Sequence, residues 1–474
     1  MNEVLHRIIT GINAILWNHV LIYLLVGVAI LFTLRTGGVQ ARGLRAALSL
    51  VLRPSNQPGI SPYQAFAIGV ASRVGTGNII GVAVALTLGG PGAIFWMWVV
   101  AILSMSSAFA EATLAQIFKI RAGAHGDAQG FRGGPSYYIH LGLGSRACGV
   151  LFSIALIIAF GFVFNAVQAK SMAETLQTAF GWSPLLVGVG LAAVVATVIF
   201  GGVRRVAPVA ARLVPFNALL YLGLAAYVMV THATALPGMI RMIVDHAFGL
   251  GQAAGGLAGV AVQSALLNGI KRGLFSNEAG MGSAPNAAAT ASACHPAEQG
   301  LLQMLGVVFD TLVVCTATAS IILLSGLYEP GAGMQGAALV HAAMNLHIGP
   351  WGSALFALIV TLFAFSAIIG NYAYAESNIQ FICKRPIVLH LFRGGLLGMV
   401  VFGSVASLPL VWDLADSSAG LMAIINLVAI LLLSRHACAA WRDYREQRRR
   451  GVRAPVFDRH TLPGLSARLP KDVW

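Results

Sequence analysis

The 474-residue sequence predicts an all-α polytopic membrane protein with eleven transmembrane helices, built as one extra N-terminal helix and two inverted five-helix repeats. Three observations predict this class. Only 10% of the residues are charged, against about 25% in a soluble domain, and 57% are hydrophobic. Apolar runs long enough to cross a bilayer recur along the chain. Two related glycine motifs fall inside two of those runs.

The spans follow from the length of the apolar runs, because a helix needs about 20 mostly apolar residues to cross the hydrocarbon core. The eleven expected spans cover residues 8–34, 63–88, 92–118, 147–169, 185–202, 206–230, 256–284, 300–325, 352–382, 389–409 and 418–434. Two further stretches, 39–52 and 238–248, are too short or too polar and are expected to form helices at the membrane interface. Most of the 54 glycines therefore lie where they permit close helix packing or helix breaks.

Basic residues alternate between the two sides of the membrane. They follow the odd-numbered spans, at Arg35, Arg42, Arg45, Arg53, Lys119, Arg121, Arg132, Arg146, Arg204, Arg205, Arg212, Lys384, Arg385, Arg393 and a tail from Arg435. The alternate segments 89–92, 326–351 and 411–417, expected as loops, contain no Lys or Arg. The positive-inside rule predicts an outside N-terminus and a cytoplasmic C-terminus in a bacterial inner membrane. The net charge of +14 is thus a topology signal and does not indicate nucleic-acid binding.

The two glycine motifs indicate an internal repeat. Gly75-Thr76-Gly77-Asn78 in the second span and Gly280-Met281-Gly282-Ser283 in the seventh share an offset (280 − 75 = 205) that also relates Pro91 to Pro296. Five spans separate the motifs, so the seventh span crosses in the opposite sense to the second, as in inverted-repeat transporters. The chain is divided accordingly into a first helix with an interfacial helix (1–62), two five-helix repeats (63–231 and 232–434) and a basic cytoplasmic tail (435–474).

The repeated glycines predict two broken helices that face one another. A backbone group freed in lipid costs several kcal/mol unless something satisfies it. Free N–H groups at a half-helix N-terminus suit a carboxylate, and freed carbonyls suit Na⁺ or an ammonium group, so two facing breaks suit a small zwitterion. An isolated glycine pair favours close helix packing, but paired breaks flanked by polar residues favour a binding site, and these residues are Thr76, Asn78, Ser276 and Asn277. No strand precedes Gly75 as in a nucleotide-binding loop, and Ser283 lacks a GxSxG frame, so no enzyme is expected.

Four strings carry a family resemblance: VGTGNIIGVAVALTLGGPGAIFWMW (74–98), FAEATLAQ (109–116), FRGGPSYYI (131–139) and NGIKRGLFSNEAGMGSAPNAAATA (268–291). They resemble the alanine/glycine:cation symporter family, the sodium:alanine symporters, and the similarity covers nearly the whole chain. The resemblance implies the LeuT-like fold of the amino acid–polyamine–cation superfamily, with a discontinuous first helix in each repeat. It also implies alternating access driven by a sodium gradient.

The resemblance also implies the positions of the binding residues. A small neutral amino acid would contact Thr76, Gly77, Asn78, Gln168, Phe275, Ser276, Asn277 and Gly280. A Na⁺ ion would be held by main-chain oxygens near Ala71 and Val74 and by the hydroxyls of Thr361 and Ser366. Residue chemistry alone leaves other readings open: Gln168 fits a helix–helix hydrogen bond, Phe275 fits core packing, and Ser366 fits a bond to its own backbone.

Seven ionisable residues lie within spans and away from their ends: Arg73, Glu111, Lys271, Arg272, Glu278, Asp310 and Glu376. Arg73 and Glu278 share the repeat offset, and we hypothesise that they pair across the two-fold axis or that each braces the opposite broken helix. The alternative is that both side chains extend toward water. Lys271 and Arg272 are candidates to neutralise Asp310 or Glu376. Glu111 is a candidate to cap a polar cluster at the cytoplasmic end of its span.

Together these features predict a Na⁺-coupled symporter that carries alanine or glycine into the cell, with no cofactor other than the coupling ion. The alternative is a carrier of glutamine or D-amino acids coupled to Na⁺ or H⁺, with Glu278 as the proton carrier. A channel or a non-transporting sensor is the alternative from another class. A channel would not need paired helix breaks, and the tail is too short for a sensor domain. The expected partners are the amino acid, Na⁺ and lipid, including anionic lipid at the tail, and no nucleic acid.

Overall fold

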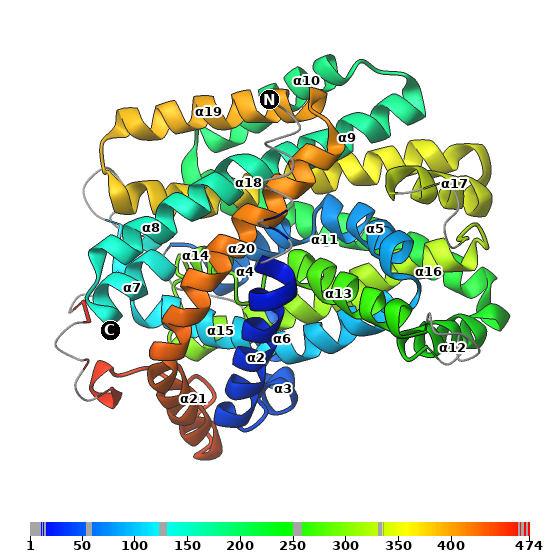
Figure 1. The fold of residues 1–474 in the computed structure, drawn as a ribbon. Coiled ribbons are helices and arrows are strands. Elements are labelled where there is room, and N and C mark those ends of the chain that lie inside the picture. Colours follow the sequence, from blue (N-terminus) through cyan, green and yellow to red (C-terminus); the bar gives the residue numbers. More distant parts are fainter. Residues whose placement is uncertain are drawn as a thin grey trace.

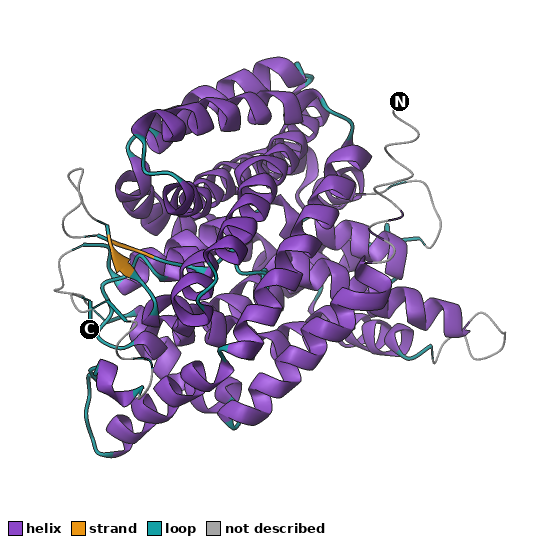
Figure 2. Cartoon of the chain, turned by 60° about the vertical axis from the view of Figure 1, so that its left-hand side comes forward, coloured by secondary structure: helices purple, strands orange, loops and turns teal. Residues whose placement is uncertain are grey.

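The computed structural model describes residues 11, 13, 16–53, 59–122, 130–249, 258–329, 334, 336–462, 465, 469–470 and 473–474. Helices make up nearly all of this part of the chain, and the two short strands pair as one antiparallel hairpin (Figure 2). The elements are η1 (Leu16–Leu21), α2 (Ile22–Thr36), α3 (Val39–Val51), α4 (Pro62–Arg73), η2 (Thr76–Asn78), α5 (Ile80–Gly89), α6 (Gly92–Ile117), β1 (Ile120–Arg121), β2 (Phe131–Arg132), α7 (Pro135–Leu143), α8 (Arg146–Leu156), η3 (Ile157–Val163), α9 (Phe164–Phe180), α10 (Pro184–Ile199), α11 (Gly202–Thr231), η4 (Ala233–Ala235), α12 (Leu236–Ala247), α13 (Ala258–Asn277), α14 (Pro285–Ala288), α15 (Pro296–Val307), η5 (Val308–Cys315), α16 (Thr316–Leu324), α17 (Gly336–Ile348), η6 (Gly349–Trp351), α18 (Gly352–Ile382), α19 (Pro386–Val405), α20 (Leu408–Leu432), α21 (Ser434–Arg449) and η7 (Arg459–Thr461).

The helices confirm an all-helical, polytopic membrane protein. Seven described helices are long and apolar enough to cross a membrane, and the number rises to nine when each of two bent pairs counts as one span. Every expected span overlaps a helix, but α10 has only 16 residues and α13 carries Lys271 and Arg272, so neither is among the nine. The expected starts of the first and seventh spans, residues 8–10 and 256–257, lie outside the described residues.

Three segments expected as loops contain helices. Residues 411–417 belong to α20, which begins with a proline in its first turn, and α7 and α17 lie in the segments that follow the third and eighth spans. Apolar length alone does not reveal these helices, because their polar residues interrupt the apolar run without breaking the backbone. The two stretches expected at the interface are helical, as α3 and α12, and α18 has the bounds that the sequence predicts.

The predicted cytoplasmic tail is partly folded onto the helix bundle. Figure 1 shows α21 beside α2 and α3 at the lower end of the molecule. The indole N–H of Trp441 donates to the carbonyl of Thr36 at 3.0 Å, and His295 Nε2 lies 3.1 Å from Asp443 Oδ2. Burial lowers the pKa of His295, although the contact with Asp443 opposes that shift. The first part of the tail is therefore a structural element and not a free basic segment.

Glycine allows several helices to approach one another closely. A β-carbon added at Gly269 of α13 would overlap the carbonyl oxygen of Ala93 in α6. One added at Gly370 of α18 would lie 2.7 Å from the backbone nitrogen of Ser72 in α4. These contacts connect the broken helices to their neighbours, and no larger residue fits at either glycine without movement of a backbone.

We expect Gly269→Ala to destabilise the protein by about 2 kcal/mol, because the added methyl group forces α13 away from α6. The midpoint of thermal unfolding in detergent, followed by circular dichroism, measures the effect. Gly259→Ala in the same helix is the matched control, since a β-carbon at Gly259 meets no described atom within 4 Å. Equal midpoints for the two variants would contradict the close packing of these helices.

Candidate functional site

The first break interrupts the second predicted span. Helix α4 ends at Arg73, the short turn η2 covers Thr76–Asn78, and α5 begins at Ile80, so that the two halves are bent by 58°. Gly75 adopts an extended backbone at the point of the break. A β-carbon at this position would lie 2.8 Å from the amide nitrogen of Gln168, so the glycine leaves room for that side chain.

The break offers backbone and side-chain groups to a ligand. The N–H of Thr76 donates to Oε1 of Gln168 at 2.9 Å. The hydroxyl of Thr76 is completely buried and has no hydrogen-bond partner among the described residues. The Thr76 N–H at the break thus already binds the side-chain amide oxygen of Gln168, a residue of α9. A carboxylate oxygen is an acceptor of the same kind and, being charged, a stronger one.

Most of the implied substrate residues meet at this break. Asn78 Nδ2 donates to Ser276 Oγ at 2.8 Å, which connects η2 with the end of α13. A β-carbon at Gly77 would lie 3.0 Å from the ring of Phe275. Asn277 accepts the N–H of Ala279 at 3.0 Å, and its Nδ2 has no partner among the described residues. All of these side chains are buried, so the structure brings Thr76, Gly77, Asn78, Gln168, Phe275 and Ser276 into one cluster.

The second break has a different backbone. Helix α13 ends at Asn277, and the next helix, α14, has only four residues. Glu278, Gly280 and Gly282 have φ angles of 54°, 83° and 86°. A positive φ is strained for a glutamate, while glycine adopts it freely. The glycine motif therefore ends a helix here, as the sequence predicts, but the two breaks do not share one conformation.

Glu111 accepts hydrogen bonds from the backbone N–H groups that the second break leaves free. Its carboxylate accepts the N–H groups of Gly280 and Gly282, each at 3.2 Å, and the side-chain amide of Asn426 at 2.8 Å. Glu111 therefore caps a polar cluster, as expected, and this cluster is the turn after α13 together with Asn426 of α20. Its position inside an apolar span was the signal in the sequence, but its partners lie in distant segments.

Gly280 does not join the cluster at the first break. A β-carbon at Gly280 would lie 3.1 Å from both Leu25 and Leu427. The backbone N–H of Gly280 donates to Glu111. The left-handed turn directs this residue toward α2 and α20. Alignment of the two glycine motifs in sequence does not reveal this direction, because it depends on the φ angles of the turn.

A chain of polar side chains joins the two breaks to α9 and α18. Ser72 Oγ lies 2.6 Å from Asn371 Oδ1 and 3.3 Å from Glu278 Oε1. Asn371 donates to Asn165 Oδ1 at 2.9 Å, and Ser283 donates to Glu278 Oε2 at 2.5 Å. Glu278 thus braces the first broken helix through Ser72, which is one of the two arrangements expected for it.

Arg73 contacts α15 instead of the second break. Its guanidinium donates to the backbone oxygen of Gln303 at 3.0 Å and to the side chain of the same residue. No Arg73–Glu278 pair is found among the ion pairs of the described residues. The expected pairing across the two-fold axis is therefore corrected: each residue reaches the other half of the chain, but they reach different partners.

The residues implied for Na⁺ separate into two groups. In a continuous helix the N–H of Gly75 would donate to the carbonyl of Ala71, and the N–H of Asn78 to that of Val74. Here the N–H of Gly75 donates to Arg73 and the N–H of Asn78 to Gly75. The carbonyls of Ala71 and Val74 therefore lack these helical hydrogen bonds. Oxygen atoms freed in this way are suitable ligands for a hard cation. No group of three His, Cys, Asp or Glu side chains converges in the described part of the chain.

The two implied hydroxyls lie on different sides of α18. Ser366 is buried, donates to the carbonyl of Phe363 at 3.0 Å and receives the amide of Asn217 at 3.4 Å. Thr361 lines an apolar pocket with Leu176 and Trp182 instead. Five residues turn a helix by about 500°, so Thr361 and Ser366 point about 140° apart. The two hydroxyls therefore do not converge on one point, and Oγ1 of Thr361 has no hydrogen-bond partner among the described residues.

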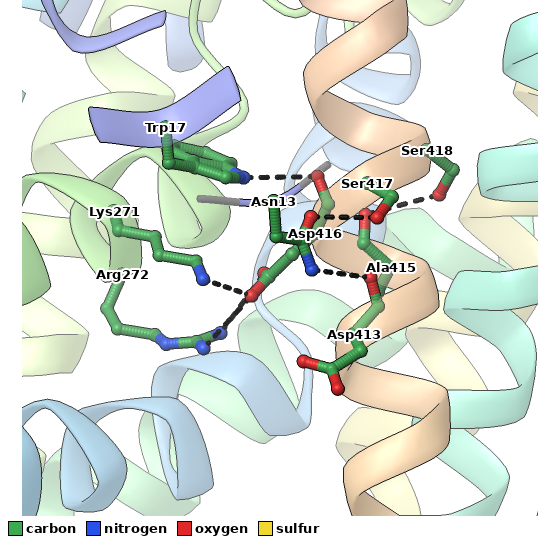
Figure 3. Close-up of polar contacts among 9 residues, drawn as sticks. All are labelled: Asn13, Trp17, Lys271, Arg272, Asp413, Ala415, Asp416, Ser417 and Ser418. Atoms are coloured by element: carbon green, nitrogen blue, oxygen red, sulfur yellow. Dashed lines mark hydrogen bonds and ion pairs between the residues drawn. The ribbon is translucent and has the colours of Figure 1, made fainter. Parts of the chain in front are cut away.

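Lys271 and Arg272 both pair with Asp416 of α20 (Figure 3). The distance to Asp416 Oδ2 is 2.5 Å from Lys271 Nζ and 3.3 Å from Arg272 NH2. The indole of Trp17 donates to the carbonyl of Asp416 at 3.2 Å, which adds the first helix to this cluster. Neither Asp310 nor Glu376 is the partner. The sequence reading missed Asp416 because it placed that residue in a loop.

An aromatic column connects this ion-pair cluster to the first break. Phe275 stacks on Phe164 with ring centroids 4.8 Å apart, and it lies 4.9 Å from the ring of Trp412. The guanidinium carbon of Arg272 lies 4.8 Å from the centre of the Trp412 ring. The column and the ion pairs close one side of the cluster, and a moving α13 would have to break contacts with both.

Glu376 lies apart from the breaks. It accepts the amide of Gln380 at 3.1 Å and lines a cavity of about 350 Å³ with Arg132, Arg204 and Thr290. The cavity lies among the hairpin strand β2, the start of α11 and the end of α18. Segments that the charge pattern assigns to the cytoplasmic side thus form its wall.

A polytopic helical protein with broken helices around a buried polar cluster has the architecture of secondary transporters. Residues 2–459 match the profile of the sodium:alanine symporter family. The chain belongs to this family, whose members are transporters and not enzymes, and it is a multi-pass, Na⁺-coupled amino-acid transporter. The channel and sensor alternatives do not agree with this membership.

The relatives differ in their named substrates. The chain is 48% identical to a probable sodium/glutamine symporter of Bacillus subtilis, over 98% of this chain and 95% of that protein. It is 36% identical to a sodium/alanine symporter of Methanococcus maripaludis, over 93% and 98% of the two chains. The crystal structure of a manganese transporter mutant of Eremococcus coleocola shares the fold, with a TM-score of 0.51 and 14% identity over 82% and 81% of the chains.

We expect Asp416→Asn to destabilise the protein by about 3 kcal/mol, because it leaves two basic side chains without a counter-charge. Arg272→Gln should reduce the thermal midpoint more than Lys271→Gln, since the side chains are 8% and 23% exposed. Arg241→Gln is the control, because that side chain is 84% exposed. A wild-type midpoint for Asp416→Asn would show that this cluster does not stabilise the fold.

Proposed function

We propose that this transporter carries a small neutral amino acid, alanine or glycine first, into the cell with Na⁺ by alternating access. The hydrogen bond from the Thr76 N–H to the amide oxygen of Gln168 is the observation that carries the proposal. The substrate carboxylate would replace this oxygen at the break, next to the unpartnered hydroxyl of Thr76. Asn78, Ser276 and Asn277 would complete the polar side of the site.

The aromatic column favours a substrate with a small side chain. Phe275 is held between Phe164 and Trp412 and lies against Gly77, so little space remains beside the break. The 48% identity to a probable sodium/glutamine symporter supports glutamine as the second candidate. A glutamine side chain would need Phe275 to turn away from Gly77. D-amino acids are a further alternative.

The coupling ion would bind where α4 frees its carbonyls. We assign Na⁺ to the oxygens of Ala71 and Val74 together with Ser366, whose hydroxyl would have to turn from Phe363 toward the ion. Thr361 would take no part in this site. Proton coupling through Glu278 is the alternative, since this carboxylate contacts both halves through Ser72 and Ser283.

The transport cycle would move two inverted repeats, residues 63–231 and 232–434, against one another, with eleven spans in all. Pro91 and Pro296, which share the repeat offset, stand at the starts of α6 and α15, and this supports the repeat. We place the N-terminus outside and the C-terminus in the cytoplasm of the bacterial inner membrane. The cavity beside Glu376 would then be the cytoplasmic vestibule, and the basic tail would face anionic lipid.

Transport is tested with purified protein in proteoliposomes under an imposed inward Na⁺ gradient. We expect uptake of radiolabelled alanine that requires the gradient, with competition by unlabelled alanine and glycine stronger than that by glutamine or D-alanine. Equilibration that is independent of the gradient would disprove symport. Dependence on a pH gradient alone would assign coupling to protons, and stronger competition by glutamine would make glutamine the substrate.

We expect Gln168→Ala to reduce alanine uptake at low substrate concentration about tenfold, because the Gln168 amide, once displaced from Thr76, would contact the bound amino acid. Gln177→Ala is the matched control, since Gln177 is exposed on the same helix, α9. Initial uptake rates are compared after normalisation to the amount of reconstituted protein. Equal rates for both variants would remove Gln168 from the substrate site.

A further inference from the structure

A loop after the second break joins separate parts of the helix bundle. Helix α14 ends at Ala288, and residues 289–295, which we call the bridging loop, lead from it to α15. Ala291 pairs with Ile60 in a parallel β-bridge, and the N–H of Ser292 donates to the carbonyl of Ile60 at 2.9 Å. Ile60 stands just before α4, the helix that leads to the first break. The bridging loop therefore connects the chain after the second break to the chain before the first break.

Two side chains at the end of α6 bind this part of the chain. The amide of Gln116 donates to the carbonyl of Ala291 at 3.2 Å and also to that of Ala288. The ammonium group of Lys119, just after α6, donates to the carbonyl of Ala291 at 2.9 Å and to Oε1 of Gln116 at 2.7 Å. A buried backbone carbonyl is costly when it lacks a hydrogen-bond donor. Gln116 and Lys119 therefore stabilise the bridging loop in its present place.

Lys119 is buried against two aromatic rings. It is 1% exposed, and it belongs to none of the ion pairs that join described residues. The Nζ atom lies 4.1 Å from the centre of the Phe131 ring and 4.4 Å from that of Trp474, so two aromatic faces lie beside the charge. The indole N–H of Trp474 donates to the carbonyl of Gln116 at 3.2 Å. Gln116, Lys119 and Trp474 together form a latch on the bridging loop.

The bridging loop contacts the tail on one side and a cavity on the other. The N–H of Phe457 in the tail donates to the carbonyl of Cys294 at 3.1 Å. The rings of Phe457 and Trp474 lie 5.2 Å apart, edge to face, so the tail extends the latch. Thr290 lines the cavity of about 350 Å³ beside Glu376. The latch thus holds one part of the wall of this cavity.

A path from this cavity to the two breaks would pass the latch. Helices α4 and α14 pack against one another, α4 leads to the first break, and α14 follows the second. Ile60 and Thr290 both line the cavity, beside the ends of these two helices. An open path between α4 and α14 therefore requires the bridge between Ile60 and Ala291 to separate. The latch binds Ala291 and opposes this separation.

We propose that Lys119 is a positioning residue for transport, which keeps the face with this cavity closed by holding Ala291. The inference rests on alternating access, which is part of the proposed function. Contacts made only in the closed arrangement stabilise it relative to the open one, so their loss shifts the protein toward the open state. The amino acid then binds more readily from the open face and less readily from the opposite face. The charge pattern assigns the open face to the cytoplasm.

Lys119→Met tests this role by the half-saturating alanine concentration at each face. Methionine keeps most of the side chain and removes the ammonium group. Uptake of radiolabelled alanine is measured in right-side-out and inside-out membrane vesicles, each with the same inward Na⁺ gradient. Starting from a protein that is mostly closed at the cavity face, a shift of about tenfold lowers half-saturation about fivefold at that face and raises it about twofold at the other. Lys384→Met is the matched control, because Lys384 is exposed and belongs to the same set of cytoplasmic charges.

Hydrogen–deuterium exchange measures the bridging loop itself in purified protein. The N–H of Ser292 is bonded to Ile60 in the closed arrangement, and it exchanges when this bond opens. We expect peptides that cover residues 289–295 to exchange about fivefold faster in Lys119→Met than in the wild type, in proportion to the larger open fraction. Lys384→Met should exchange as the wild type does.

A second variant keeps the test valid if Lys119→Met does not fold. Trp474→Phe keeps an aromatic ring beside Lys119 and removes the indole N–H that binds Gln116. We expect the same changes as in Lys119→Met at smaller size, about twofold in exchange of the bridging loop. Gel filtration in detergent identifies the variants that fold. A folded Trp474→Phe protein with wild-type half-saturation and exchange would count against the latch.

Three outcomes would overturn the role of Lys119 while leaving Na⁺-driven uptake intact. Lower maximal rates at both faces with unchanged half-saturation would make Lys119 a purely structural residue. Half-saturation that changes in the same direction at both faces would place the effect at the substrate site. Unchanged half-saturation and exchange would show that the latch does not hold the closed face. Wild-type vesicles without Na⁺-driven alanine uptake would instead reject the proposed function, and the exchange measurement would still test the latch.

Discussion

The structure depends on one constraint, which is that a backbone group freed inside a bilayer must be satisfied by the protein or by its ligand. Two helices end near the centre of this bundle, and each break meets the constraint differently. Gln168 provides a neutral amide to Thr76, whereas Glu111 provides a carboxylate to Gly280 and Gly282. A neutral amide is a weaker acceptor than a carboxylate and is easily exchanged for one. The first break is thus suited to a changing partner and the second to a permanent one.

This difference distinguishes the two breaks despite their similar glycine motifs. The second break is held by Glu111 and Asn426, and Glu278 extends from it to Ser72 of the first. The chain of polar groups continues through Asn371 to the helices that surround both breaks. Direct hydrogen bonds therefore connect the first break to α18. These contacts join segments that lie about 200 to 300 residues apart in the sequence.

Local features of the sequence predicted the fold well, and contacts between distant segments limited the prediction of the site. The breaks at Gly75 and Gly280 were found because glycine acts on its own backbone, and the bounds of α18 followed from apolar length. The partner of Lys271 and Arg272 was not found, because Asp416 is 144 residues from Arg272 along the chain. Asp416 also adds charge to an apolar stretch, which made a helix resemble a loop. The direction of a side chain around its helix, as at Thr361, depends on packing that no single segment encodes.

The position of Trp412 has a spectroscopic consequence. Its indole contacts both the Phe275 ring and the Arg272 guanidinium, at the junction of α13 and α20. The energy of indole emission depends on nearby charge and on contact with water. Separation of the two helices would remove the cation and admit solvent, so the emission of this residue would change as the site opens. Among the 8 tryptophans of the chain, this ring would report optically on the separation of α13 from α20.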